Sequence, residues 1–194
     1  MNRTRFAVLS AAVLCISCGN NNQPSNPAPV DMGGTVWKIV VAQENRTVIS
    51  QGPKRTVGNL YGDSASIAGL GTEFGRFNRM AFLTIDSLRI YGSTVTDTFP
   101  GGYSAYGSTI SATVVTSDTT LHLVLNKDAY NQLWLDFPAV KTAYYMPGMG
   151  MTVSSIFGSL AERDGYIATL DTAFHAATMD SIVYTTVMYA YIEQ

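Results

Sequence analysis

The chain has 194 residues, enough for one domain with a hydrophobic core, and only 13% of them are charged. Two of its 12 basic residues, Arg3 and Arg5, lie in the first seventeen positions, so the remainder carries ten basic residues against 14 acids, a net charge of −4. This balance excludes nucleic acid as a partner, because phosphates are bound by positive surfaces. Cys15 and Cys18 are the only cysteines, so no disulfide can stabilise the rest of the chain.

The first seventeen residues have the order of an export signal. Arg3 and Arg5 supply the positive start, residues 6–16 form an apolar run, and the small Ser17 precedes Cys18. As a helix this run would be about 16 Å long, roughly half of the hydrocarbon thickness of a bilayer. A permanent transmembrane span is therefore disfavoured.

The segment Cys15, Ile16, Ser17, Cys18 resembles the lipobox of bacterial lipoproteins, although Cys15 stands where leucine is usual. The resemblance implies that residues 1–17 are a lipoprotein signal peptide and that Cys18 becomes the lipidated N-terminus. A lipid carrying two or more chains anchors a protein stably, which makes the membrane its first partner. By the same resemblance, Gly19 after the cysteine favours the outer membrane of a bacterial cell envelope.

Residues 18–33 are expected to form the lipidated cysteine and a disordered tether. Residues 19–32 read GNNNQPSNPAPVDM, which contains three prolines and no apolar periodicity, so this stretch cannot bury enough surface to fold. The remaining residues, 34–194, are expected to form a single β-rich domain.

Beyond Gly34 the apolar residues recur at spacing two, and Val, Ile, Thr and Tyr are abundant, which is typical of β-strands. Residues 152–161 and 166–174 are expected to pair through an Asp164-Gly165 turn, and 108–116 to pair with 119–126. Other expected strands are 35–42, 47–51, 80–91, 93–99, 132–137 and 181–192, the last covered on both faces. Residues 52–79 are expected to form a long loop with one short helix. The pattern predicts an all-β domain, a single antiparallel β-sandwich or barrel of roughly ten strands in a largely meander order.

The segment from Gly34 to Lys38 resembles the opening strand of lipocalin-like domains, in which a Gly-x-Trp motif places an indole across the floor of a barrel. The similarity covers five residues, and the glycine-to-tryptophan spacing is one residue longer here. Trp37 is accordingly expected to be a core aromatic residue of the first strand.

Three methionines, Met146, Met149 and Met151, lie in the sequence MPGMGM, which is expected to be a loop. Thioethers are the soft ligands that Cu(I) prefers, and the spacing is similar to that of methionine-rich copper loops in periplasmic proteins. His122 or His175 could complete such a Cu(I) site. The alternative interpretation is that the methionines fill gaps in a core or line an apolar ligand site.

Eleven tyrosines, several of them in clusters, are a further unusual feature. A tyrosine ring with its polar tip suits sugar stacking or protein contact, although β-propensity alone also recruits tyrosine to strands. The candidate ligand-binding residues on this interpretation are Trp134, Tyr144, Tyr145, Tyr189 and Tyr191.

Signals for an enzyme are weak. Ser154, His175 and Asp171 could be written as a catalytic trio, but no Gly-x-Ser-x-Gly motif marks a nucleophile. Asp136, close to Trp134, is the acid that would best suit a glycosidase. We therefore expect a non-enzymatic envelope lipoprotein, without a cofactor, whose β domain binds a glycan, an apolar small molecule or an envelope protein. The alternatives are a copper-binding lipoprotein and an envelope hydrolase.

Overall fold

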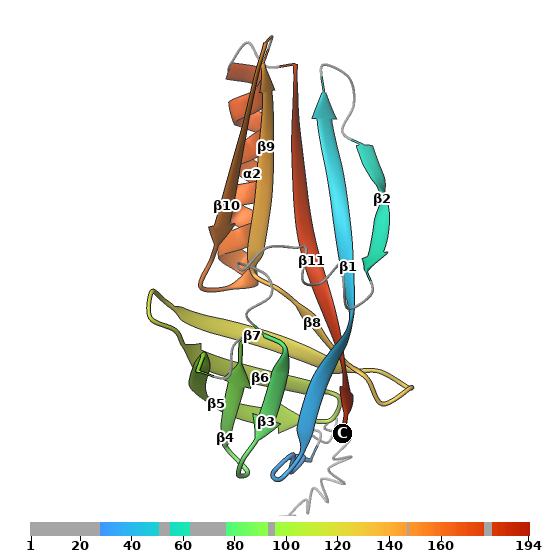
Figure 1. Ribbon diagram of the computed structural model, residues 1–194, viewed down its shortest axis with the longest axis vertical. Helices are drawn as coiled ribbons and strands as arrows, with labels where there is room; N and C mark the ends of the chain where they lie inside the picture. Colours follow the sequence, from blue (N-terminus) through green and yellow to red (C-terminus); the bar gives the residue numbers. More distant parts are fainter. Residues whose placement is uncertain (1–27, 51–54, 63–76, 93–95, 147, 177–179) are drawn as a thin grey trace, which may run out of the picture.

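The computed structural model of the chain describes residues 28–50, 55–62, 77–92, 96–146, 148–176 and 180–194. In this described part, one antiparallel sheet and the helix α2 make up the fold (Figure 1). The elements are β1 (Val36–Ser50), β2 (Arg55–Gly62), β3 (Arg79–Phe82), β4 (Ser87–Tyr91), β5 (Thr98–Tyr106), β6 (Thr109–Val115), β7 (Thr120–Lys127), β8 (Leu133–Asp136), β9 (Ala139–Met146), β10 (Met149–Ile156), α2 (Leu160–Ala176) and β11 (Ser181–Glu193).

Eight of the strands close into a barrel. They follow the order β11-β8-β7-β6-β5-β4-β3-β1, and antiparallel pairing of β1 with β11 closes the ring. Neighbouring strands run in opposite directions, so the barrel is of the up-and-down type, and closure removes the sheet edges within it. The predicted all-β antiparallel fold is confirmed, and of the two architectures left open by the sequence it is the barrel.

The two longest strands, β1 and β11, continue beyond one end of the barrel (Figure 1). Their extensions and the strands beside them form a region that we call the upper sheet. There β11 pairs with β9, β9 with β10, and β1 with β2, so the upper sheet has the order β10-β9-β11-β1-β2. Helix α2 packs on one face of this upper sheet, where Leu170 joins Val140, Ile182 and Tyr184 in a small hydrophobic cluster.

Strand β11 contributes to both cores with opposite faces. Ile182 and Tyr184 face α2, whereas Val187, Tyr189 and Tyr191 belong to the core of the barrel. Even and odd positions of a strand point to opposite faces, so the buried side changes where β11 enters the barrel. The expectation that this strand is covered on both faces is met only in part, because each face is buried along a different part of the strand and Ile192, at the barrel end, is 41% exposed.

Large side chains fill the interior of the barrel. Phe77 and Phe137 meet edge to face with their ring centroids 5.0 Å apart, and Phe82 and Tyr103 do so at 4.8 Å. Trp37 is fully buried, as expected, and its indole nitrogen donates a hydrogen bond of 2.9 Å to the Thr35 hydroxyl. The interior is therefore a packed core.

The predicted hairpin of residues 152–161 and 166–174 is wrong, because residues 160–176 form helix α2. The helix begins after Ser159, whose hydroxyl accepts the backbone N–H of Glu162, while the Glu162 carboxylate accepts the N–H of Gly158. The bond to Ser159 satisfies one of the amides that the first helical turn leaves without partners, and the bond to Glu162 fixes the backbone just before the helix. The Asp164-Gly165 pair is part of the helix rather than a turn.

Four other sequence predictions need correction. Residues 36–50 form one strand with a bulge between Ile39 and Val41, not two strands. Strand β2 lies inside the expected long loop, and residues 80–91 fold as the β3–β4 hairpin. Of the expected strand 93–99, residues 93–95 lie outside the described ranges, and β5 begins at Thr98. The expected pairing of 108–116 with 119–126 is confirmed as β6 and β7.

The described chain begins beside the barrel. Val30 donates a backbone hydrogen bond of 3.0 Å to Ala105 of β5, and Met32 is buried in the barrel core. Contacts with the barrel therefore start ahead of the expected domain boundary at Gly34. Cys18 and residues 1–27 lie outside the described part. Among the helices that the structure describes, none has the length and apolar character needed to cross a bilayer.

Candidate functional site

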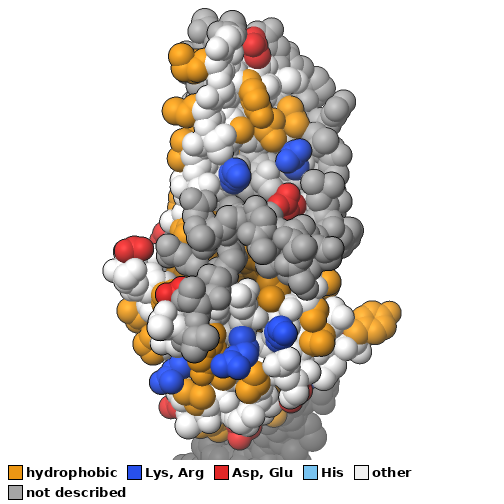
Figure 2. Space-filling model, in the orientation of Figure 1, with side chains coloured by type: hydrophobic (Ala, Val, Ile, Leu, Met, Phe, Trp, Pro, Cys, Tyr) orange, Lys and Arg blue, Asp and Glu red, His pale blue; other side chains and the backbone are white. Residues whose placement is uncertain are grey.

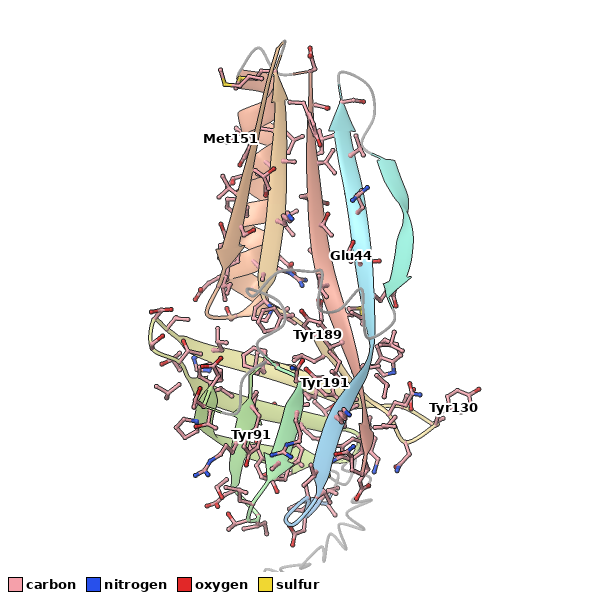
Figure 3. All side chains as sticks on the ribbon, viewed as in Figure 1. Glu44, Tyr91, Tyr130, Met151, Tyr189 and Tyr191 are labelled. Atoms are coloured by element: carbon pink, nitrogen blue, oxygen red, sulfur yellow. The ribbon has the colours of Figure 1, made fainter. Side chains whose placement is uncertain are left out.

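Two of the tyrosines expected at a binding surface lie inside the barrel. Tyr189 and Tyr191 are fully buried (Figure 3), and the Tyr191 hydroxyl donates to the backbone carbonyl of Phe77 at 3.0 Å. Burial raises the pKa of both hydroxyls above its ordinary value. Their expected role in surface binding is wrong, and their role is in the core.

The side chains of the adjacent residues Tyr144 and Tyr145 of β9 lie on opposite faces of the sheet. Tyr144 points toward α2, where its hydroxyl lies 3.1 Å from that of Tyr166. Burial, and then the hydrogen bond with Tyr166, raise the pKa of Tyr144 to about 12. Tyr145, on the opposite face, is 46% exposed. Only Tyr145 of this pair is available to a partner.

Trp134 is half-buried on the outside of the barrel and supports the loop between β7 and β8. Its indole nitrogen donates to the Asp128 carboxylate at 2.9 Å, and that carboxylate also accepts the backbone N–H groups of Tyr130 and Gln132. The bond from Gln132, followed by that from Trp134, lowers the pKa of Asp128. The loop holds Tyr130 outward with 86% of its surface exposed (Figure 3), a residue that the sequence did not single out.

The methionine-rich segment is a hairpin rather than a loop. Met146 ends β9 and Met149 begins β10 directly opposite it, while Met151 follows two residues along the same face. Met149 is 64% exposed and Met151 is 51% exposed. The structure therefore brings the three predicted thioether residues to one face of the hairpin.

Neither histidine is shown to join these methionines. The backbone N–H of His122 donates to the carbonyl of Gly158, which lies just after the last residue of β10. Met149 is the first residue of β10, about 23 Å away along the strand. His175 lies in α2, but its side chain is outside the described part. No group of three His, Cys, Asp or Glu side chains in the described ranges is arranged to hold a metal ion.

Within the described part of the chain, the residues considered for hydrolysis do not form a catalytic group. Asp136 makes a bidentate ion pair with Arg163 of α2. Ser154 lies on β10, and Asp171 and His175 lie on α2, where their side chains are outside the description.

A surface hollow of about 470 Å³ lies on the outer wall of β5, β6 and β7, and no motif in the sequence marks it. Gly102, Thr113 and His122 are cross-strand neighbours in one row, and Ser104, Ser111 and Val124 are neighbours in the next. All six are exposed. Along each strand they look like ordinary solvent-facing residues, and only the register of the three strands shows that they form one surface.

The lining of this hollow combines hydroxylated side chains with apolar ones, among them the exposed Val124. Ser104, Ser111 and Thr113 supply hydroxyls, and Nδ1 of His122 lies 3.3 Å from the Thr113 hydroxyl. Tyr106, two residues after Ser104, is 51% exposed and continues the same face of β5. The hollow thus combines hydrogen-bonding groups with a neighbouring aromatic ring.

The class that these observations define is an eight-stranded up-and-down barrel with a filled interior and a helix-covered sheet at one end. Comparison with family models, curated proteins and solved structures finds no match to this chain.

Proposed function

We propose that this protein is a lipid-anchored, non-enzymatic envelope protein that binds a glycan on the outer wall of β5, β6 and β7. The observation that carries the proposal is the hollow with its floor of Ser104, Ser111 and Thr113 beside His122. Its volume of about 470 Å³ lies within the roughly 300–1,000 Å³ range of small-ligand sites.

The open shape of this wall and its mixture of hydroxyl and apolar groups support a sugar over an apolar molecule. Sugar hydroxyls exchange hydrogen bonds with serine, threonine and histidine side chains, and the C–H face of a sugar packs on an aromatic ring such as that of Tyr106. An apolar ligand would need an enclosed apolar space, and the barrel interior is filled by its own side chains. The residues that line the hollow include no carboxylate, which supports binding rather than glycoside hydrolysis.

Anchorage through Cys18 is part of the same proposal. Nine residues separate Cys18 from Ala28, where the described chain begins, and the ten peptide steps between these two residues span at most about 35 Å when extended. A segment of this length keeps the barrel close to the membrane surface. The glycan would then belong to the envelope itself or to a surface that faces it.

Glycan binding can be tested on the mature protein with soluble cell-wall fragments and a panel of oligosaccharides, followed by NMR shifts of β5–β7 amides. Ser111→Trp fills the floor of the hollow on an exposed strand position, and His122→Ala removes a hydrogen-bonding group. Both variants should weaken binding at least tenfold, about 1.4 kcal/mol. Tyr130→Ala, on a distant loop, is the matched control. Shifts that leave β5–β7 unaffected, or equal binding by all variants, would refute the site.

Anchorage has its own test. Cells grown with a labelled fatty acid should incorporate the label into the wild-type protein and not into Cys18→Ser. Mass spectrometry of the mature chain should find Cys18 at its start with a lipid attached. A retained leader, or a free thiol at Cys18, would contradict the anchored form.

The methionine face of the β9–β10 hairpin supports a second candidate function, Cu(I) binding. Met146 and Met149 are direct cross-strand neighbours, and Met151 shares their face. Residues opposite each other in an antiparallel pair have Cβ atoms about 4.5–5.5 Å apart, within reach of a shared soft ion. Cu(I) titration against a competing chelator should show binding by wild type and its loss in a Met149→Ala, Met151→Ala variant. Equal, weak binding by both proteins would end this alternative.

A further inference from the structure

Strand β10 is an exposed edge of the upper sheet. It stands at one end of the strand order and, in the described part of the chain, pairs only with β9. Its first five residues are exposed, and Val153 is 37% exposed in addition to the two methionines. Figure 2 shows hydrophobic side chains along this edge of the molecule.

This edge lacks the features that ordinarily prevent strands from pairing. Exposed edge strands are usually protected by a charge, a proline or a bulge. The sequence of β10, MGMTVSSI, contains no charge and no proline, and its register with β9 runs unbroken from Met149 to Ile156. The free side of β10 is therefore a regular template for another strand.

We propose that a second copy of this chain pairs with β10 antiparallel, about a twofold axis that passes through Thr152 and is normal to the sheet. In that register Met151 of each copy lies opposite Val153 of the other, on the face that α2 covers in each copy. Met149 lies opposite Ser155, and on the other face Gly150 lies opposite Ser154. The strand is thus complementary to itself, with apolar side chains adjacent and no like charges opposed.

The position of the chain start is compatible with this dimer. The described chain begins beside the barrel, at the end of the molecule remote from the β9–β10 turn (Figure 1). A twofold axis normal to the sheet places the two chain starts at opposite ends of the dimer. When the joined sheets lie along a membrane, tethers of at most about 35 Å from both ends can reach the same surface. Confinement to that surface raises the effective concentration of the copies.

Sedimentation equilibrium of the mature protein in detergent is the first test. The wild-type protein should show a concentration-dependent dimer, and Val153→Lys, which places two charges at the paired edges, should raise its dissociation constant on the order of tenfold or more. Val115→Lys adds the same charge to β6, a strand with partners on both sides, and should leave the dimer unchanged. A monomer at all concentrations, or a dimer that survives Val153→Lys, would overturn the proposal.

Cysteine cross-linking tests the register. Thr152→Cys would place two cysteines opposite each other on the axis, at the Cα separation of about 4.5–5.5 Å that suits a disulfide. Ser154→Cys would face Gly150 of the other copy and has no cysteine partner. Rapid cross-linking of Thr152→Cys alone is expected on a non-reducing gel, and equal rates for both variants would refute this register. The outcome is independent of glycan binding, because the hollow lies on β5–β7.

Discussion

Arg163, in the first turn of α2, and Asp136, at the end of β8, form a bidentate ion pair that joins the helix to the barrel. Nη2 of Arg163 donates to Oδ2 of Asp136 at 3.0 Å, and Nη1 donates to Oδ1 and to the backbone carbonyl of Phe137. The Arg163 residue is only 7% exposed. Although burial alone would lower the pKa of Arg163, its two carboxylate partners, Asp136 and Asp164, leave it raised. The guanidinium therefore stays charged in a nearly buried position.

Removing one partner of this pair should destabilise the protein. Asp136→Ala leaves the buried guanidinium without its main counter-charge, and we expect a loss of about 2–4 kcal/mol in the free energy of unfolding. Urea denaturation would measure the loss. The double variant Asp136→Asn, Arg163→Met should recover much of it, because neither side chain then carries an uncompensated charge. A double variant as unstable as Asp136→Ala would contradict this account.

Two adjacent glycines on β5 provide a matched pair for a second prediction. A Cβ atom on Gly101 would lie 2.5 Å from the backbone oxygen of Thr113, whereas one on Gly102 would meet nothing closer than 3.5 Å. Gly101→Ala must therefore push β5 and β6 apart, and we expect it to cost about 1–3 kcal/mol of stability. Gly102→Ala should be close to neutral. Thermal unfolding of the two variants compares them directly, and equal effects would show that the contact at Gly101 relaxes without strain.

The strands that alternate strictly could be predicted from the sequence, and the helix could not. Leu121, Leu123 and Leu125 of β7 alternate with exposed residues, which predicts a strand with one buried face. In α2 the buried residues Arg163 and Leu170 lie seven positions apart, with the half-buried Tyr166 and Ile167 between them. This is helical spacing, but its first member is an arginine and an Asp-Gly turn signal falls inside it.

Polar strands were missed for a related reason. The middle of β1, near Glu44 and Arg46, lacks an apolar alternation, yet its backbone pairs with β11 on one side and β2 on the other. Hydrogen bonds on both edges hold such a segment extended whatever its side chains are. The hollow could not be predicted for the same reason. Ser104, Ser111 and Thr113 are neighbours only because of the register between β5 and β6, which the sequence does not reveal.

The hydroxyl of Tyr191 should contribute measurably to stability. It donates a buried hydrogen bond to the carbonyl of Phe77, 114 positions away in the chain. Tyr191→Phe keeps the ring in the barrel but leaves that carbonyl without its partner, so we expect a loss of about 1–3 kcal/mol in urea denaturation. Val114→Ala, a truncation elsewhere in the same core, indicates what lost packing alone costs. No loss in Tyr191→Phe would mean that the carbonyl finds another donor.

Buried tyrosines should make the protein sensitive to alkaline pH. The pKa values of Tyr189 and Tyr191 are raised by burial, so both hydroxyls stay protonated in the folded state at a pH where unfolded tyrosine, with a pKa near 10, is ionised. The folded state then binds more protons, and its stability falls as pH rises. The stabilisation is complete below about pH 10 and should decline above it by about 1.4 kcal/mol per pH unit for each of these two residues.

Urea denaturation at intervals from pH 9 to 11.5 checks this prediction. Tyr191→Phe should reduce the slope of unfolding free energy against pH above pH 10 by about 1.4 kcal/mol per unit, since one buried hydroxyl is removed. Tyr144, with a pKa raised to about 12, should add to the slope in the same direction until it ionises in the folded state as well. Tyr130→Phe, at a ring that is 86% exposed, serves as the control and should leave the slope unchanged. A flat stability profile through pH 11 would show that the barrel admits the tyrosinate form.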